Sequence, residues 1–546
     1  MNAERLLAHY HRIADVEDAI PHLRRFILDL AVRGKLVPQE ARDEPAKGFR
    51  RPNDPSAPFD LPQNWRWARI GDQLDLLNGM AFKPTDWIGS GLRIVRIQNL
   101  NNPAAPFNFC DPEKARERSL IDDGSFLISW SGTPGTSFGA FIWDRGPAVL
   151  NQHIFRCDFK TEAFIAPFLR LAINGRLDEM IARAHGGVGL QHITKGKLEA
   201  LLIPLPPLAE QHRIVAKVDE LMALCDRLED AHTRREVLRD RLTTASLTRL
   251  TAPDTDKQAF QSYARFAVET LPTLTARPDQ IKTLRQTILN LAVRGKLVEQ
   301  YPTDEPAAAL LERIATAKGR TRRATVTVDH EAEPYPVPET WRWASLDELI
   351  KAGPQNGISP KPTTREGAPK AITLTATTSG VFNPTHFKHV DAKIPDGSDF
   401  WLTDGDLLFQ RGNTRDYVGM AAIYEGPSKT FLFPDLIIRT RVSEYVSLRF
   451  VHLAAVSPPA RAFLSENATG AQATMPKINQ STLVSLPIPL PPLAEQHRIV
   501  AKVDELMALC DRLEASLATG DTIRRRLLES LLHEALVSAI AIGLAA

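Results

Sequence analysis

Side chains suited to reading DNA bases gather at the ends of several expected strands. Arginine combined with asparagine or glutamine is the set that recognises guanine and adenine edges in the major groove. Strand ends are also polar simply because they meet water, so each cluster taken alone fits a solvated loop as well. The candidate DNA contacts are Arg93, Arg96, Gln98, Asn99, Ser129, Trp130, Thr133, Gln152, Arg411, Asn413, Thr414, Arg415 and Lys477.

No catalytic signature accompanies these clusters. The sequence lacks a Walker A loop, a GxGxxG after a strand, HExxH, GxSxG and the tetrad with which amino-methyltransferases hold a flipped base. The glycines of "GGVGLQHIT" at Gly186 do not complete a phosphate loop, and we interpret them as a turn. His212 and His497 have no second ligand at metal spacing and are expected at a surface or interface. We therefore predict neither catalytic nor metal-binding residues.

Charge gives no support for binding by bulk electrostatics. Lys and Arg total 67 against 65 acidic residues, and residues 60–203 hold 16 basic and 15 acidic side chains. Any DNA contact must therefore come from a locally basic face that reads base edges.

The elements that position these residues occur twice. "PLAEQHRIVAKVDELMALCDRLE" begins at Pro207 and returns unchanged at Pro492, an offset of 285. "ILDLAVRGKLV" at Ile27 recurs with one change at Ile288, offset 261, and "WRWA" recurs after 276 residues. The landmarks keep their order while the offset grows, so the chain is two diverged copies of one plan.

We predict an α+β fold with a pseudo-two-fold internal repeat, in which two mixed domains are separated by a pair of long antiparallel, coiled-coil helices. The expected segments are 1–60, an N-terminal helix and Pro-rich linker; 61–205, mixed domain 1; 206–250, a long helix; 251–336, a linker with a short helix; 337–490, mixed domain 2; and 491–546, the second long helix.

The long helices show a coiled-coil seam. Apolar residues from Ile214 to Leu228 follow a 4,3,4,3 spacing, and the helix continues for roughly 40 residues, or about 60 Å. Such a helix needs a partner, and its own copy is the nearest one. Val215, Met222, Val500 and Met507 lie just off the seam, where they form either a second face for other subunits or additional core.

Within the mixed domains, short segments read as strands, among them 93–100, 125–132, 371–378 and 406–414. Gly34 is placed to end the first helix in a left-handed cap. Cys225 and Cys510 are expected as buried apolar residues, and the cysteine spacing fits a reducing compartment. No signal peptide or membrane span is recognised, so a cytoplasmic location is expected.

Taken together, these stretches carry a resemblance. "LPIPLPPLAEQHRIVAKVDEL", "LRQTILNLAVRGKLV" with "DEPAAALLERI", the paired "WRWA" openings, "IVRIQNLN", "DGDLLFQRGNT" and "LNQHIFR" resemble the specificity subunit of type I restriction-modification systems over nearly the whole chain. Family members often carry Arg in an "S-R-S-G-T" turn, where this chain has Trp130, which can stack on a base or pack; Arg411 keeps the arginine in "QRGNT".

The resemblance implies a non-catalytic subunit. Two recognition domains would each read one half of an asymmetric, bipartite site on double-stranded DNA, about one helical turn (roughly 34 Å) apart. The helices would dock two methyltransferase subunits, which would methylate adenine at N6, and two restriction subunits would join them. S-adenosylmethionine, ATP and Mg would sit on those partners, and no cofactor on this chain. The family explains the repeat: two identical partners need two near-identical docking surfaces.

Two other functions stay open. A single-chain DNA methyltransferase or nuclease with built-in recognition would need catalytic motifs that the sequence lacks. A coiled-coil adaptor that binds no DNA would keep the helices but leave the polar strand ends unexplained.

Overall fold

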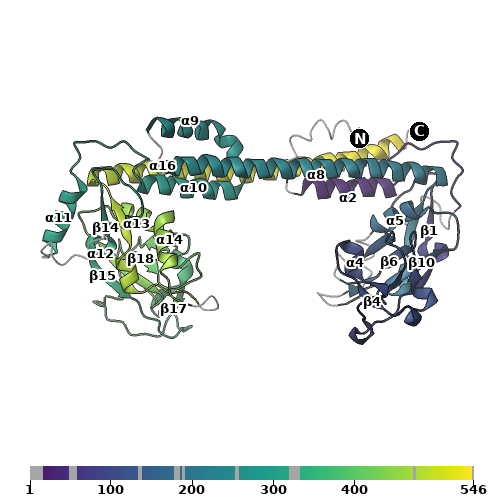
Figure 1. Cartoon of the computed structure of the whole chain (residues 1–546), viewed down its shortest axis with the longest axis horizontal. Coiled ribbons are helices and arrows are strands. Elements are labelled where there is room, and N and C mark those ends of the chain that lie inside the picture. The colour runs from purple at the N-terminus through teal and green to yellow at the C-terminus, as the bar shows by residue number, and fades with distance from the viewer. Residues whose placement is uncertain are drawn as a thin grey trace. The chain divides into compact units, whose positions relative to one another are not determined.

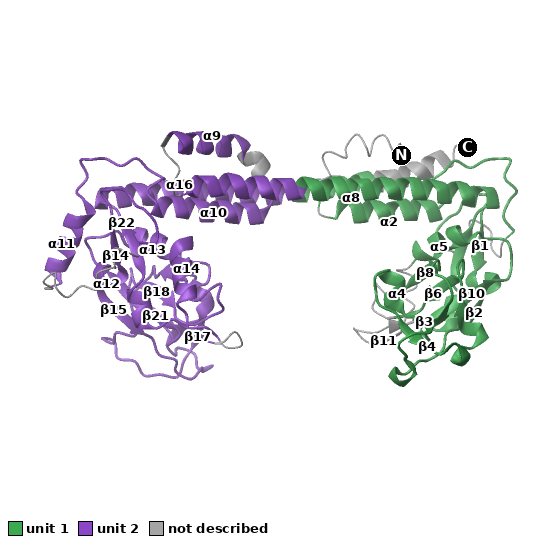
Figure 2. Ribbon diagram, viewed as in Figure 1, with its two compact units in different colours: residues 1–235, 521–546 green, residues 236–520 purple. Residues whose placement is uncertain are grey.

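The computed structural model describes residues 16, 18–47, 58–132, 138–176, 185–186, 191–252, 257–318, 333–470 and 475–543. The chain divides into two compact units, residues 1–235 with 521–546 (unit 1) and residues 236–520 (unit 2), coloured separately in Figure 2. Two long helices, α8 (Leu208–Thr251) and α16 (Leu493–Gly543), contribute residues to both units. Mixed strands and helices in each unit confirm the predicted α+β class.

Unit 1 contains three sheets and a strand pair. The pair is β1 (Arg66–Arg69) with β13 (Leu202–Leu205). The sheets, in spatial order, are β2 (Leu74–Asn78), β10 (Ile154–Phe159), β6 (Phe126–Ser129) and β8 (Gly139–Ile142); β4 (Asn108–Cys110), β3 (Leu92–Val95), β9 (Ala148–Leu150) and β5 (Leu120–Ile121); and β11 (His185–Gly186), β12 (Gln191–His192) and β7 (Ser131–Gly132).

Short helices surround these sheets. They are α2 (Ala19–Val32), α3 (Ile70–Gln73), α4 (Ile97–Asn101), α5 (Ala166–Asn174) and α7 (Lys195–Glu199), with 3-10 turns η1 (Pro84–Asp86), η2 (Pro112–Lys114) and η3 (Glu117–Ser119). The α5 helix packs on β8 and on α2 (Figure 1). The hydrophobic core of unit 1 therefore lies between the β2-β10-β6-β8 sheet and the helices α5 and α2.

Within the described residues, unit 2 repeats the strand pair and two of the three sheets in the same spatial order, with three strands instead of four in the second sheet. They are β14 (Arg342–Ser345) with β22 (Pro487–Leu490); β15 (Ile350–Asn356), β21 (Ile437–Val442), β18 (Leu407–Gln410) and β19 (Ala421–Ile423); and β17 (Phe387–His389), β16 (Lys370–Ile372) and β20 (Phe431–Leu432). Its helices besides α8 and α16 are α9 (Lys257–Leu274), α10 (Pro278–Val293), α11 (Ala307–Ala317), α12 (Leu346–Leu349), η6 (Leu374–Thr377), α13 (Leu448–Val456), α14 (Pro458–Glu466) and α15 (Gln480–Val484).

Contacts with α10 show in which direction each long helix runs within unit 2. The start of α10 lies beside α8 through Arg277 and Glu236, and Lys296, just beyond its end, donates to the Ala252 carbonyl. Contacts with α16 run the other way along the chain. Arg285 donates to Asp511, whereas the carbonyl of the later residue Glu299 accepts from the earlier residue Arg498. The portions of α8 and α16 in unit 2 therefore run in opposite directions.

The predicted seam is buried, but largely against its own unit. Ile214, Val218 and Cys225 belong to one core with Ile27 of α2 and Trp65 of the mixed domain. In unit 2, Ile499, Val503 and Cys510 enter the corresponding core. The long helices are thus parts of each unit's hydrophobic core.

Three strand predictions were too long, and in one of them, 406–414, the strand covers only Leu407–Gln410. The segment 93–100 is strand only to Val95 and then forms α4, and 371–378 leaves the strand after Ile372 and forms η6. The helix α9 was not anticipated in the linker. Gly34 does adopt the left-handed conformation, with φ +67°, and a Cβ there would overlap Pro62. The four cysteines are buried and unpaired.

Candidate nucleic-acid interface

A tryptophan–glutamate contact holds each mixed domain to the first turn of its long helix. The Trp65 indole N–H donates to Glu210 Oε2 at 2.9 Å, and Trp341 donates to Glu495 Oε2 at 3.0 Å. Burial raises the pKa of both glutamate carboxyls, and the indole hydrogen bonds oppose that rise. The repeated tryptophan and glutamate therefore form a structural joint.

The glutamine of the same motif continues the joint. Gln211 Oε1 accepts a hydrogen bond from the Ile165 amide at 2.9 Å, and Gln496 Oε1 accepts one from the Ser447 amide at 2.8 Å. Both glutamines are fully buried, and their amide groups also donate to proline carbonyls just before the helix. This glutamine ties the start of α5 or α13 to the long helix.

An arginine of the motif binds the Pro-rich connector. Arg213 pairs with Asp43 at 2.5 Å, and Arg498 pairs with Asp304 at 2.6 Å. The Arg213 guanidinium lowers the pKa of the Asp43 carboxyl. Connector, mixed domain and helix therefore meet in the same arrangement in both units.

In unit 1 the candidate contacts meet where strands end. The strands β3 and β9 are parallel neighbours, so Arg96, directly after β3, falls in register with Asn151, which precedes Gln152 directly after β9. The β6 strand ends beside them, because the Trp130 amide donates to the His153 carbonyl at 3.3 Å. The fold thus brings together residues from three separate stretches of sequence.

Arg96 stands at the centre of this group with an aromatic neighbour. Its guanidinium lies 5.6 Å from the ring centroid of Trp87, which is 41% exposed, and its Nη2 donates weakly to Asn108 at 3.5 Å. Gln98 is exposed on α4. An exposed indole beside a guanidinium suits stacking on a base. Sequence reasoning missed Trp87, although an isolated tryptophan in a Gly/Pro-rich loop was visible.

Two predicted contacts in this domain, Asn99 and Ser129, are fully buried, and a third, the exposed Arg93, makes an internal hydrogen bond. Asn99 is fully buried; its Oδ1 accepts from the Arg96 amide, and its Nδ2 donates to two loop carbonyls at 3.2 Å. Ser129 is also fully buried at the end of β6. Arg93 donates to the Arg145 carbonyl at 2.6 Å, away from the carboxyl end of its strand. A DNA contact is unsupported for Asn99 and Ser129, because DNA cannot reach them.

Trp130 packs against its own domain. Its ring stacks on Phe155 with centroids 5.6 Å apart and lies 5.4 Å from the His153 ring. Gln152 remains exposed, with Nε2 beside the His153 ring. Thr133 lies outside the described residues.

Arg411 occupies in unit 2 the backbone position that Trp130 occupies in unit 1. Both amides donate to the loop after the parallel strand, and both carbonyls accept from the segment preceding the last short helix. The partners are Leu436 and Ile478 for Arg411, and His153 and Ile193 for Trp130. The two domains therefore present different chemistry at one equivalent place.

The Arg411 guanidinium is half-buried, and one hydrogen bond holds it within the described part of the chain. Its Nη1 lies 3.4 Å from the Asp435 carbonyl, while the Asp435 carboxylate accepts from the Ser359 hydroxyl. A guanidinium has five N–H donors, so most remain available for a base or phosphate. Sequence reasoning missed Asp435, which corresponds to Gln152.

The other candidates in unit 2 surround Arg411. Asn413 uses its amide internally, donating to Gln410 Oε1 at 2.6 Å. Thr414 is exposed, and Arg415 is exposed with a bond to the Ser465 carbonyl at 3.1 Å. Lys477 is exposed on a short bridge opposite Gly412. The structure thus gathers Arg411, Asn413, Thr414 and Lys477 around one loop.

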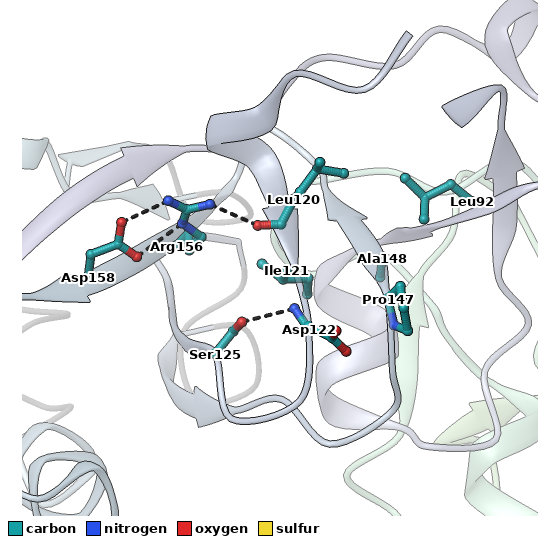
Figure 3. A pocket seen from close by; sticks show the side chains of 9 residues that line it. All are labelled: Leu92, Leu120, Ile121, Asp122, Ser125, Pro147, Ala148, Arg156 and Asp158. Atoms are coloured by element: carbon teal, nitrogen blue, oxygen red, sulfur yellow. Dashed lines mark hydrogen bonds and ion pairs between the residues drawn. The ribbon is translucent and has the colours of Figure 1, made fainter. Parts of the chain in front are cut away.

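A pocket of about 440 Å³ in unit 1 lies at the opposite ends of β3 and β9, next to Leu92 and Ala148. Figure 3 shows Arg156 in it, bound to both carboxylate oxygens of Asp158 and to the Leu120 carbonyl. The Ser125 hydroxyl accepts from the Asp122 amide. The side chains of Arg156 and Ser125 therefore hold the backbone of unit 1 together at this pocket.

The four predicted partner-binding residues pack inward to different degrees. Val500 is 9% exposed and belongs to the unit 2 core, and Met507 packs against that core with its sulfur 3.9 Å from Arg285 Nη1. Val215 and Met222 are half-buried against the unit 1 core. The prediction of a second docking face on these side chains is thus unsupported for Val500, which is core.

His212 and His497 are exposed, as expected. No group of three or more potential metal ligands occurs within the described residues. In that same part of the chain, no helix is long and apolar enough to cross a membrane.

Comparisons with known proteins agree with the repeated plan. A family model described as type I restriction modification DNA specificity domain matches residues 62–239 and 452–519. The EcoEI type I restriction enzyme specificity subunit of Escherichia coli is 26% identical, over 95% of this chain and 94% of that protein. The EcoAI specificity subunit, also of Escherichia coli, is 25% identical over the same shares.

A solved structure shares the fold. It comes from work on the assembly and conformational transition of a type I R-M system, with TM-score 0.51 and 18% identity, and it covers 88% of this chain and 99% of its own.

Proposed function

Because the chain belongs to the family of type I restriction-modification DNA specificity proteins, we propose that it is the non-catalytic subunit that selects the DNA sequence for such a complex. Mixed domain 1 reads one half of an asymmetric bipartite site, and mixed domain 2 reads the other. The candidates for these contacts that reach the surface are the half-buried Arg96 and Arg411, and the exposed Trp87, Gln98, Gln152, Thr414, Arg415 and Lys477.

One observation carries this proposal. The joints between mixed domain and helix are the same in both units, whereas the equivalent strand ends carry Trp130 and Arg411. A chain that holds two different DNA-contacting surfaces by the same joint is suited to a site with two unlike halves. Arg411 favours guanine, because a bidentate guanidinium matches its O6 and N7.

The repeated joints between mixed domain and helix also support the proposal that this chain binds partner subunits in pairs. The two long helices form an antiparallel pair that spaces the mixed domains and docks two methyltransferase subunits, which in turn recruit two restriction subunits. The half-sites lie about one helical turn, roughly 34 Å, apart. S-adenosylmethionine, ATP and Mg belong to those partners, this chain binds no cofactor, and the complex works in the cytoplasm on double-stranded DNA.

A gel-shift and methyl-transfer comparison tests the function. The chain with its methyltransferase subunits should bind one sequence class of duplex DNA and transfer methyl groups from S-adenosylmethionine, while either component alone should not methylate. Methyl transfer by the purified chain alone would establish the single-chain enzyme instead. Partner binding without any sequence preference would establish the adaptor.

A further inference from the structure

A cavity of about 190 Å³ opens beside Trp343 in unit 2, away from the strand ends considered above. Its walls include the aromatic rings of Tyr335, Trp343 and Phe463, together with Pro487 of β22. Glu466, the last residue of α14, lines its exposed side. Aromatic walls with one carboxylate suit a cationic ligand.

The same frame exists in unit 1. Trp67 meets Phe59 edge-on with centroids 4.9 Å apart, and Trp343 meets Tyr335 edge-on at the same distance. Each tryptophan stands opposite a proline on the paired strand, Pro204 for Trp67 and Pro489 for Trp343. The two sites are therefore equivalent in backbone and in ring geometry.

In unit 1 a guanidinium fills this frame. The Arg176 side chain lies 5.2 Å from the Trp67 ring and 5.8 Å from the Phe59 ring, and Arg176 is 5% exposed. Its Nη1 donates to the Leu202 carbonyl. Leu202 corresponds to Pro487 by strand register, and Pro487 lines the cavity of unit 2.

The sequence of unit 2 removes that arginine. Phe168 packs edge-on against Trp65, and Phe450 packs in the same way against Trp341, which fixes the register of α5 and α13. Arg176 follows Phe168 by the same distance along the chain as Pro458 follows Phe450. Proline has no cation to place between the rings, and its neighbours Ser457 and Pro459 line the cavity.

We propose that the cavity beside Trp343 binds a guanidinium group, the chemical class of an arginine side chain, supplied from outside this chain. The proposal stands independently of the proposed function. The ligand stacks between the rings as Arg176 does, donates to the Pro487 carbonyl and is balanced by Glu466, which has no ion-pair partner within the described residues.

The positive charge of a second arginine, which lies outside the cavity, does not prevent a guanidinium group from binding inside it. The Arg294 guanidinium lies 4.1 Å from the Tyr335 ring, and in unit 1 Arg33 lies 4.6 Å from the Phe59 ring. Unit 1 therefore already holds two guanidinium groups around this aromatic ring.

Nuclear magnetic resonance of the full chain, labelled with ¹⁵N at the indoles of its eight tryptophans, tests the proposal. Trp343→Phe identifies the Trp343 signal, and methylguanidinium is the probe. We expect that signal to shift and saturate at millimolar probe. Methylammonium, which has the charge without the plane, should bind about tenfold more weakly, and urea, which has the plane without the charge, should not bind.

Matched variants locate the site. Glu466→Gln should weaken binding several-fold, and Pro458→Arg, which restores the arginine of unit 1, should abolish the Trp343 response. Arg176→Ala should make the Trp67 signal responsive as well. A Trp343 signal that never saturates, that responds equally to urea, or that still titrates in the Pro458→Arg variant would overturn the proposal.

The source of the guanidinium is settled by two further probes. Nα-acetyl-arginine amide, which mimics a residue within a protein, should bind as tightly as methylguanidinium if the site takes an arginine of a partner chain. Free L-arginine should bind more tightly than both if the site takes the amino acid. Failure of every probe contradicts the proposal and leaves DNA selection by the complex unaffected.

Discussion

The indole N–H of Trp65 lies 2.9 Å from Oε2 of Glu210, a carboxylate 1% exposed, and Trp341 repeats this contact with Glu495 at 3.0 Å. A buried carboxylate with an uncharged donor is costly in its ionised form. The contact therefore links the attachment of each mixed domain to pH.

The double variant E210Q/E495Q measures that link. Because burial raises the folded-state pKa of both carboxyls, their protonated form favours folding below the ordinary value of 4.5, and this contribution is lost as pH rises through the folded pKa. We expect the unfolding free energy of the wild type, relative to the variant, to fall as pH rises from the ordinary value of 4.5 through the folded-state pKa. Urea unfolding across that range measures it, and parallel pH curves would refute it.

The Arg213–Asp43 pair should titrate in the opposite direction. The arginine holds the pKa of Asp43 below its ordinary value, so the stability from this pair is present above that value and lost as pH falls through the folded pKa. Arg213→Met should cost about 2 kcal/mol at neutral pH, because it leaves a buried carboxylate unpaired. Arg24→Met is the control: its acidic partners are more than half exposed, and the loss should be below about 1 kcal/mol. Equal losses would contradict this.

Two equivalent glycines should be intolerant of a side chain. A Cβ at Gly79 would overlap the Asn151 carbonyl, and one at Gly357 would overlap the Phe433 carbonyl. We expect Gly79→Ala and Gly357→Ala each to lower the unfolding free energy by about 1–3 kcal/mol or more. Gly89→Ala, with nothing within 4 Å of the new carbon, should be nearly neutral. Thermal unfolding compares them, and a neutral Gly357→Ala would refute the packing argument.

Arg411 should determine one base of the second half-site. Arg411→Ala should reduce discrimination at a single base pair by about 1–3 kcal/mol, because it removes a guanidinium with most donors available. Binding of the complex to duplexes substituted one position at a time measures this. Trp130→Ala is the control, since it should leave the second half-site unchanged. Unaltered preference in the Arg411 variant would remove its assignment.

The sequence predicted the structural elements that occur in both copies of the repeat. Identical letters at 207–229 and 492–514 indicated two like helices, and the joints formed by Glu210 and Glu495 use residues from exactly matched motifs. Their contacts with Trp65 and Trp341 were hidden, because 145 and 154 residues separate the partners and only the fold brings them together.

The contact residues were harder to predict. Arg96, Asn99 and Ser129 look alike as polar residues after apolar runs, yet Asn99 and Ser129 are fully buried, and Asn99 donates to carbonyls of its own loop. The inward and outward alternation of side chains along a strand also stops where the strand ends. The strand β3 ends at Val95, and the chain then enters α4. Polarity alone does not distinguish a side chain that binds a ligand from one that holds a loop.

Genome-wide mapping of N6-methyladenine tests the central claim most directly, in a host that carries this chain with its methyltransferase partner. We predict one asymmetric motif of two defined parts separated by undefined bases, lost when this chain is deleted and altered in only one part by Arg411→Ala. A motif that survives deletion of the chain, or one with a single continuous part, would contradict the account.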